Sequence, residues 1–474
     1  MRITVIGGSD IPNEIGASCY YCEDKDFMVD CGGGMSWNGQ RSVSTPPPFL
    51  NLIKKPLHAL FLTHSHGDHI TFVPLLKELG LITKDTVIWS TPQTEEMSHE
   101  MFWDSKRNGI SYSRSSIWSL PRFEHIPVSG EFEIVPGTKA YSKHVGHLHG
   151  ARDLIIQDES GMNFAFTGDW CFHDQPTVKG MAAVSEWPVL PDIFVNTDWT
   201  YGLSGLEERQ PFAFEMVRMQ NVVKDRFSRG MFLRLFGFGQ GRVPNIALNL
   251  GRVFGPMGVP VYLDGGLSKS SWRVAHEVQV TDRDVAIPGF GDESGVYPVE
   301  NREHREELIN SKEPNIIVTT PGMGDGGLAA TYLMEGLPRR DHFIASTSYL
   351  SPHSTMYELQ EMAAHNFGQG REITITEREQ EDGEEKHTKH VVQVNAEIGR
   401  FSVPGHHGPA DELSMLRDLV EARGGEKLLA YVVGHGSLES RRVGQRLVRD
   451  FVQNPDENVT TAEPGRSFTF EWTA

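Results

Sequence analysis

Short apolar runs recur over the first two hundred positions, and glycine or polar residues close each of them. Such runs predict buried β-strands, at Ile3–Ile6, Phe27–Val29, Ala59–Leu62, Val87–Ser90, Asp153–Ile156, Phe164–Thr167 and Ile193–Val195. Segments with apolar residues at helical spacing lie between them, such as "DHITFVPLLKELG" and "TEEMSHEMFWDSKRNG". The alternation of the two patterns predicts an α/β protein.

Past residue 205 the pattern becomes regular, with a strand followed each time by a helix. Examples are "MFLRLFG" before "NIALNLGRVFG" and "NIIVTTPG" before "GGLAATYLMEG". This order predicts a parallel sheet covered by helices. The charged segment that follows, "TEREQEDGEEKHTKHV", predicts a solvated hairpin tip or loop.

The composition restricts the classes of function. The 44 basic and 63 acidic side chains among 474 residues give a net charge of −19, which argues against a general nucleic-acid coat but leaves room for a local cationic site. Cys19 and Cys22 form a CxxC in an alternating, strand-like context, so buried strand cysteines are the preferred interpretation. No apolar run is long enough to span a bilayer, and the N-terminus does not resemble a signal peptide. We therefore expect a cytoplasmic protein.

One short stretch, "FLTHSHGDHI", concentrates metal-binding side chains directly after an apolar strand. His64 and His66 alternate, so an extended backbone points them in the same direction. Asp68 and His69 are adjacent and begin a helix, so they serve a second centre more naturally than the first. The spacing predicts two neighbouring metals, and imidazole with carboxylate favours zinc, with manganese or iron as alternatives.

Further ligand types lie next to other predicted strands, ahead of one strand or at the end of another. "HVGHLHG" offers His144, His147 and His149, "TGDW" offers Asp169, and "VGHGS" offers His435. Each residue alone has an ordinary structural explanation. Because all of them lie near strand ends, where α/β sheets gather their sites, we expect them to complete the two metal sites.

These motifs, in this order, resemble the β-CASP nuclease branch of the metallo-β-lactamase-fold hydrolases. HxHxDH is at His64–His69, and "DCG" and "TGD" are at Asp30 and Asp169. The three motifs typical of the branch resemble "NTDWTYG", "FSVPGHHGPADEL" and "VVGHGS".

The resemblance implies two zinc sites with a bridging aspartate. The first would be formed by His64, His66, His147 and Asp169, and the second by Asp68, His69, Asp169 and His435. It further implies that Asp30 hydrogen-bonds to a ligand histidine from behind. Asp198 would orient His407 and hold it protonated as a phosphate contact and general acid. His144 remains an alternative to His147, and His406 to His407, because both stretches are crowded with histidines.

The implied activity is hydrolysis of RNA by a hydroxide shared between the metals, with Asp68, His407 and Asp198 as catalytic residues. In the family, RNA-processing members have histidine at the position of His435 and DNA-repair members have valine, so single-stranded RNA is the expected partner. The glycine-rich "PGMGDGG", with Gly322 and Gly324, and Arg242 are candidates for phosphate binding. A DNA nuclease, or a small-molecule hydrolase on the same fold, is the alternative, and a homodimer is compatible with the family.

The resemblance also implies the architecture. Residues 1–203 and 396–474 would form a four-layer αββα metallo-β-lactamase domain. Residues 204–395 would form an inserted α/β domain, the β-CASP insert, with RNA in the cleft between them.

Overall fold

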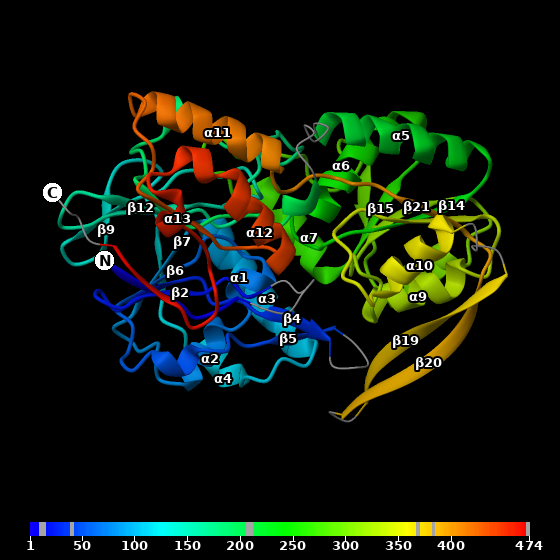
Figure 1. Ribbon diagram of the computed structural model, residues 1–474. Coiled ribbons are helices and arrows are strands. Elements are labelled where there is room, and N and C mark those ends of the chain that lie inside the picture. Colours follow the sequence, from blue (N-terminus) through cyan, green and yellow to red (C-terminus); the bar gives the residue numbers. More distant parts are fainter. Residues whose placement is uncertain (9–15, 38–41, 205–211, 366–369, 382–383, 471–474) are drawn as a thin grey trace.

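The computed structural model describes residues 1–8, 16–37, 42–204, 212–365, 370–381 and 384–470. Two α/β units lie side by side (Figure 1). One, here called the hydrolase domain, contains the N- and C-terminal parts of the chain. The other, here called the insert, is formed by the segment between them.

The hydrolase domain is built on two seven-stranded sheets. The first has the order β24-β1-β2-β3-β6-β7-β8. Its strands are β1 (Arg2–Val5), β2 (Tyr20–Cys22), β3 (Phe27–Val29), β6 (Ala59–Phe61), β7 (Val87–Ser90), β8 (Phe123–His125) and β24 (Ser467–Thr469). The second has the order β23-β22-β13-β12-β11-β10-β9. Its strands are β9 (Phe132–Val135), β10 (Thr138–Tyr141), β11 (Leu154–Gln157), β12 (Asn163–Phe166), β13 (Ile193–Asn196), β22 (Ala430–Val433) and β23 (Val459–Thr461).

The two sheets face each other across one apolar core, in which Val5 and Phe61 of the first sheet meet Phe166 and Val432 of the second. Helices cover the outer faces. They are α1 (Gly67–Ile70), α2 (Val73–Glu78), α3 (Pro92–Arg107) and α4 (Arg114–Trp118) on the first sheet, and α11 (Pro409–Ala422), α12 (Leu438–Leu447) and α13 (Pro455–Asn458) on the second. Short 3-10 turns and a small hairpin, β4 (Gly34–Trp37) with β5 (Ser42–Thr45), connect them. The predicted αββα fold is confirmed.

The insert has one parallel sheet of order β16-β15-β17-β14-β18-β21. Its strands are β14 (Phe232–Phe236), β15 (Val261–Asp264), β16 (Val296–Pro298), β17 (Ile316–Thr319), β18 (His342–Ser346) and β21 (Glu397–Arg400). Its helices are α5 (Phe212–Ser228), α6 (Arg242–Phe254), α7 (Gly266–Glu277), α8 (Arg302–Ile309), α9 (Gly327–Gly336) and α10 (Thr355–Ala364). Because β21 pairs with β18, the insert extends to Arg400, beyond the boundary at 395 that the sequence suggested.

The charged segment forms a long two-stranded ribbon, β19 (Arg371–Glu381) with β20 (Glu384–Val394). Its base packs on α9 through buried Ile373 and Val394, and the far half extends away from the insert (Figure 1). The predicted hairpin is therefore confirmed, although it is longer than a tip.

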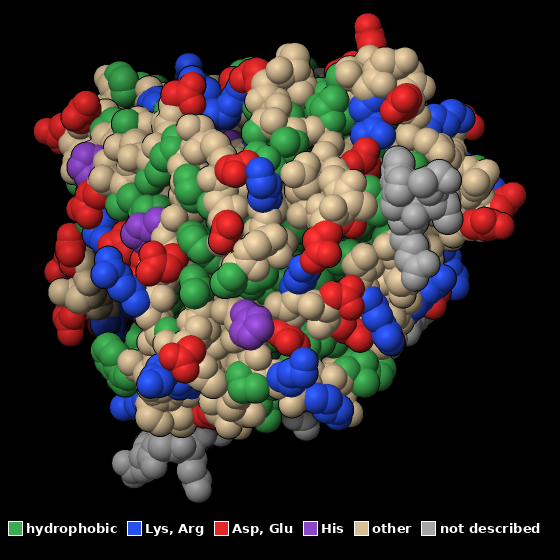
Figure 2. All heavy atoms as spheres, turned by 90° about the vertical axis from the view of Figure 1, so that its left-hand side faces the viewer, with side chains coloured by type: hydrophobic (Ala, Val, Ile, Leu, Met, Phe, Trp, Pro, Cys, Tyr) green, Lys and Arg blue, Asp and Glu red, His purple; other side chains and the backbone are tan. Residues whose placement is uncertain are grey.

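The four cysteines are buried, as expected for Cys19 and Cys22 in a strand context. None of the helices in the described part of the chain combines the length and the apolar character that crossing a bilayer requires. On the face of the hydrolase domain shown in Figure 2, acidic and basic side chains are interspersed, so the net charge of −19 does not form a single acidic surface there.

Candidate metal centre

The predicted ligands come together where several strands of the hydrolase domain end. His64 follows β6, Asp169 follows β12 and His435 follows β22. His147 comes from the segment between β10 and β11. Because β12, β13 and β22 run parallel, their carboxyl ends meet at one edge of the sheet and deliver side chains to one place.

The first group consists of His64, His66, His147 and Asp169. His66 Nδ1 lies 3.2 Å from His64 Nε2 and 2.9 Å from His147 Nε2. Asp169 Oδ2 lies 3.5 Å from His64 Nε2 and 3.6 Å from His147 Nε2. Ligand atoms at about 2.0–2.1 Å around a tetrahedral ion are roughly 3.3 Å apart, so this set fits zinc.

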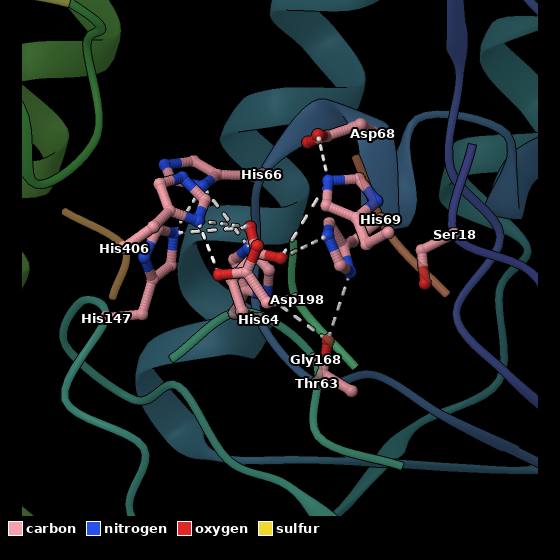
Figure 3. Close-up of polar contacts among 12 residues, drawn as sticks. Ser18, Thr63, His64, His66, Asp68, His69, His147, Gly168, Asp198 and His406 are labelled. Carbon is pink, nitrogen blue, oxygen red and sulfur yellow. Dashed lines mark hydrogen bonds and ion pairs between the residues drawn. The ribbon is translucent and has the colours of Figure 1, made fainter. Parts of the chain in front are cut away.

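The second group consists of Asp68, His69 and His435. His435 Nε2 lies 3.3 Å from Asp68 Oδ2. The other oxygen of Asp169, Oδ1, lies 3.4 Å from His69 Nε2 and 3.9 Å from His435 Nε2. Asp169 therefore presents one oxygen to each group, the arrangement expected of a bridging carboxylate. In Figure 3, His66 and His147 lie on one side of the cluster and Asp68 and His69 on the other.

The charge states of the first group also fit a metal site. Burial lowers the pKa of all three histidines of this group. The pKa of His64 falls below its usual value, that of His147 falls well below it, and that of His66 falls to about 3. Neutral imidazole is the form that binds a metal. Burial opposes ionisation of Asp169, but His69 and His435 outweigh it and hold the pKa of this carboxyl well below its usual value.

In the second group the acidic neighbours dominate. Burial opposes charging of His69, but Asp169 and Asp30 raise its pKa well above the usual value. Burial also opposes charging of His435, but Asp169 and Asp68 outweigh it and raise the pKa of His435 above its usual value. Buried His69 Nε2 and Asp169 Oδ1 have no hydrogen-bond partner. A cation between them would satisfy both atoms.

Asp30 lies behind the second group and contacts His69. Its Oδ2 accepts from His69 Nδ1 at 2.7 Å, so His69 Nε2 faces the cluster. The backbone N–H of Thr63 and the hydroxyl of Ser18 donate to the same carboxylate. Asp30 has a positive φ of 59°, and these bonds hold it in that sparsely populated conformation.

The two adjacent histidines of "GHHG" lie in different surroundings. His406 Nδ1 is 2.7 Å from Asp198 Oδ2 and 3.8 Å from Asp169 Oδ2, so His406 faces the cluster (Figure 3). His407 is buried behind it, 3.0 Å from Glu412 and edge-on to Trp170. The expected partner of Asp198 was His407. The geometry brings His406 closer, since His407 Nδ1 lies 3.8 Å from Asp198 Oδ2, and the chain bends at Gly405 and His406 so that the two rings point in different directions.

Of the two histidines left open, His147 lies in the first group and His144 does not. His144 accepts a hydrogen bond from Gly146 N through Nδ1, and Nε2 of His149 lies 3.9 Å from Asp284 of the insert. Both are buried.

A cavity opens beside the first group, between the two domains. His66, His147 and His406 line its hydrolase side, and Phe238, Arg242 and Tyr349 its insert side. Tyr201 also lines it, with its ring 5.3 Å from that of His406. Sequence reasoning missed these aromatic residues, because nothing in their local pattern distinguishes them from core residues.

The three candidates for phosphate binding have different positions. Arg242 lines the cavity and donates to Pro404 O at 2.9 Å. Gly322 packs against the backbone of Gly237, and Gly324 has a positive φ of 80° in a turn against Met356. Neither glycine lines the cavity, so close packing and turn geometry account for both.

Two family models match the chain. The Metallo-beta-lactamase superfamily matches residues 14–175, and the Beta-Casp domain matches residues 249–359.

Related proteins cover most of the chain at low identity. "Transcription termination factor FttA" of Methanocaldococcus jannaschii is 26% identical over 74% of this chain and 56% of its own length. The protein of the same name from Thermococcus kodakarensis is 26% identical over 89% of this chain and 65% of its own length. "Endoribonuclease ysh1" of Schizosaccharomyces pombe is 22% identical over 71% of this chain and 44% of its own length. The chain thus spans less than two thirds of the length of these relatives.

A solved structure, that of a protein of unknown function from Enterococcus faecalis V583, is similar across 98% of this chain and 99% of that protein. Its TM-score is 0.53 at 11% identity, which shows a shared fold and nothing more.

Proposed function

The chain belongs to the metallo-β-lactamase superfamily and carries its Beta-Casp domain, and from this premise we propose that it is a metal-dependent ribonuclease. It would hydrolyse phosphodiester bonds of single-stranded RNA. The observation that carries the proposal is the pair of ligand groups joined by Asp169, with the Asp198–His406 pair beside them.

We propose zinc in both groups, with manganese or iron as alternatives. Ligands would be His64, His66, His147 and Asp169 for one ion, and Asp68, His69, Asp169 and His435 for the other. When bound, two divalent ions supply Lewis acidity and lower the pKa of a water molecule towards neutrality. They would bring four positive charges against the two negative charges of Asp68 and Asp169, so the site would attract a phosphodiester despite the net charge of the chain.

The proton transfers are assigned to side chains of the cluster. His406 is the proposed general acid for the leaving oxygen. Asp198 is fully buried and accepts from His406 Nδ1, which fixes the orientation of the imidazole beside the cluster. Asp68, whose side chain is 25% exposed, is the ligand carboxylate that solvent reaches most easily, and it is the proposed acceptor of the proton from the attacking water.

RNA is the preferred substrate for two reasons. His435 occupies the position where RNA-processing members of the family have histidine, and one relative carries the name of an endoribonuclease. The aromatic rings of Tyr201, Phe238 and Tyr349 at the cavity are suited to stacking with unpaired bases of either nucleic acid, which favours a single-stranded substrate.

A cleavage assay tests this assignment. The zinc-loaded protein is incubated with a labelled single-stranded RNA, and in parallel with DNA of the same sequence and with a small ester or lactone. Asp68→Ala serves as the inactive control. We expect metal-dependent cleavage of RNA that the variant and a chelator abolish. Preferential cleavage of DNA or of the small substrate, or no cleavage of RNA by a protein with two metals per chain, would refute the proposal.

The same assay on RNA with a 5′-monophosphate or a 5′-triphosphate distinguishes modes of action. Mapping the products shows whether cleavage begins at an end or inside the chain.

A further inference from the structure

One segment of the insert reaches across the domain boundary into the first ligand group. It runs from Gln240 to Asn245 and includes the start of α6. Its side chains hydrogen-bond directly to the loop of His64 and His66 and to the loop of His406, and they reach the loop of His147 through Gln175.

The first contact is a reciprocal pair of hydrogen bonds with Ser65, which lies between the ligands His64 and His66. Ser65 Oγ donates to Gln240 Oε1 at 2.5 Å, and Gln240 Nε2 donates to Ser65 O at 2.9 Å. Ser65 is fully buried and Gln240 is 3% exposed. A buried pair of side chains joined by two hydrogen bonds restricts the backbone from which both ligand histidines project.

The second contact reaches the loop of His147 through Gln175. Asn245 Nδ2 donates to Gln175 Oε1 at 3.0 Å, and Gln175 Nε2 donates to the carbonyl oxygens of Gly146 and His147 at 2.8 and 2.9 Å. Asn245 Oδ1 accepts from Thr177 N at 3.1 Å, which fixes its amide orientation. The chain of bonds runs from α6 to the backbone of a ligand.

The third contact reaches the loop of His406. Arg242 Nη1 donates to Pro404 O at 2.9 Å. The next residue, Gly405, accepts from His147 Nδ1 at 2.5 Å, the bond that directs His147 Nε2 into the first group. A Cβ on Gly405 would lie 2.1 Å from Arg242 Nη2, so the guanidinium packs directly against this turn.

The second ligand group is supported differently. In the described residues, the hydrogen bonds that the structure gives the three ligands belonging to this group alone come from the hydrolase domain. His69 is held by Asp30, the carbonyl of Asp68 accepts from Ser18 N, and the N–H of His435 donates to Thr197 O.

We propose that the segment Gln240–Asn245 is a positioning element for one metal only, so that docking of the insert sets the affinity of the first group and leaves the second unchanged. This inference rests on the two-metal part of the proposed function. It deepens that proposal by giving the insert a role in assembling the metal centre, in addition to lining the cavity.

A purely structural role for these contacts makes a different prediction. If these contacts only held the two domains together, their removal would lower the melting temperature without changing the affinity of one metal more than that of the other. A selective loss of one metal is therefore the informative readout.

The experiment compares Gln240→Ala and Asn245→Ala with Asn249→Ala as a matched control. Asn249 lies one turn further along α6, and its Oδ1 accepts from Gln220 Nε2 at 2.9 Å within the insert. Each full-length protein is stripped with a chelator, dialysed and titrated with Co²⁺, and the visible absorption and the metal content per chain are measured. Melting curves confirm that each variant is folded.

We expect two Co²⁺ per chain in the wild type and in Asn249→Ala. In Gln240→Ala and Asn245→Ala one Co²⁺ should remain tight, and the other should bind roughly ten- to a hundredfold more weakly, as is usual when a supporting partner of a ligand is removed. Each variant is then combined with His435→Ala, which removes a ligand of the second group. The single remaining tight Co²⁺ should then be weakened, which assigns the effect to the first group.

Equal weakening of both ions, or unchanged binding of both in folded Gln240→Ala and Asn245→Ala, would overturn the inference. A wild type that binds fewer than two ions would instead refute the two-metal proposal. The two failures are thus distinguishable. Because no RNA enters the measurement, neither outcome depends on the identity of the substrate.

Discussion

His406 and His407 are neighbours in the chain but belong to different parts of the structure. His406 is partly exposed beside Asp198 at the cavity, whereas His407 is 3% exposed and lies among Trp170, Phe172 and Glu412. The side of the backbone to which each ring points decides its function, so substitution of each should have a different consequence.

We predict that His406→Ala lowers kcat for RNA cleavage by about two to four orders of magnitude, the usual contribution of a general acid. Both metals should remain bound, because His406 is not needed to complete either ligand group. His407→Ala should instead lower the melting temperature. Metal content, kcat and thermal melts of the two variants check this prediction, and loss of metal in His406→Ala would show that His406 is a ligand.

The buried pair His407–Glu412 predicts a pH-dependent stability. Burial disfavours the charged form of His407, but Glu412 at 3.0 Å outweighs it and raises the pKa of His407 above the ordinary value of about 6.5. The pair therefore stabilises the fold fully below that ordinary pKa, and its contribution is lost as the pH rises through the raised value.

Glu412→Gln should accordingly destabilise the protein by about 3–5 kcal/mol at pH 6, since it leaves one partner of a buried pair. The difference from wild type should shrink at alkaline pH. Urea unfolding of both proteins across this range measures it. A difference that grows with pH would contradict the assignment of the pair.

At the residue scale, the sequence predicted which residues could be ligands better than it predicted the direction in which their side chains point. HxHxDH and the strand-end Asp169 were sufficient to propose two groups, because spacing and backbone alternation restrict where such side chains point. The choice between His406 and His407 depended on one residue of register in an irregular loop. No local pattern specifies such a register. Gln240 and Ser65 were missed for a related reason, since their pairing arises only when two domains dock.

At the scale of elements, the turn after β3 is packed against the loop that carries the second ligand group. Cys31 N donates to His69 O at 2.7 Å, and Gly33 N donates to Gly67 O at 2.9 Å. Between them, a Cβ on Gly32 would lie 1.6 Å from the carbonyl oxygen of Asp68. The two loops are therefore in backbone contact, with no room for a side chain.

We predict that Gly32→Ala displaces Asp68 and His69 and weakens the second metal roughly ten- to a hundredfold while the first stays bound. Gly266→Ala is a suitable control, because a Cβ at that position meets no atom within 4 Å. Metal titration of both variants tests this. Unchanged metal binding in Gly32→Ala would mean that the loop shifts without moving its ligands.

Most elements followed from the pattern of apolar residues, including the parallel order of the insert. The C-terminal boundary of the insert did not follow from this pattern. Strand β21 has the sequence EIGR, which lacks an apolar run, and it joins the sheet as an edge strand beside β18. Edge strands have one neighbour, so their sequences are less restricted.

At the scale of the whole molecule, the candidate metal centre joins distant parts of the chain. His64 and Asp68 follow strand β6 of the first sheet, while Asp169 and His435 follow β12 and β22 of the second. Without a metal, buried Asp169 and Asp30 and the partly exposed Asp68 meet a cluster of histidines in which His66 Nε2 and His69 Nε2 have no hydrogen-bond partner. Bound ions would cross-link the edges of the two sheets.

Removal of metal should therefore lower global stability. Each ion adds about 2.7 kcal/mol when its free concentration is a hundred times its dissociation constant. We expect a chelator to lower the melting temperature by several degrees, and zinc to restore it. His435→Ala should show a smaller difference between chelated and zinc-loaded forms, because only one group remains complete. Identical melting of the wild type with and without chelator would contradict the cross-link, since ions that bind the folded state alone must stabilise it.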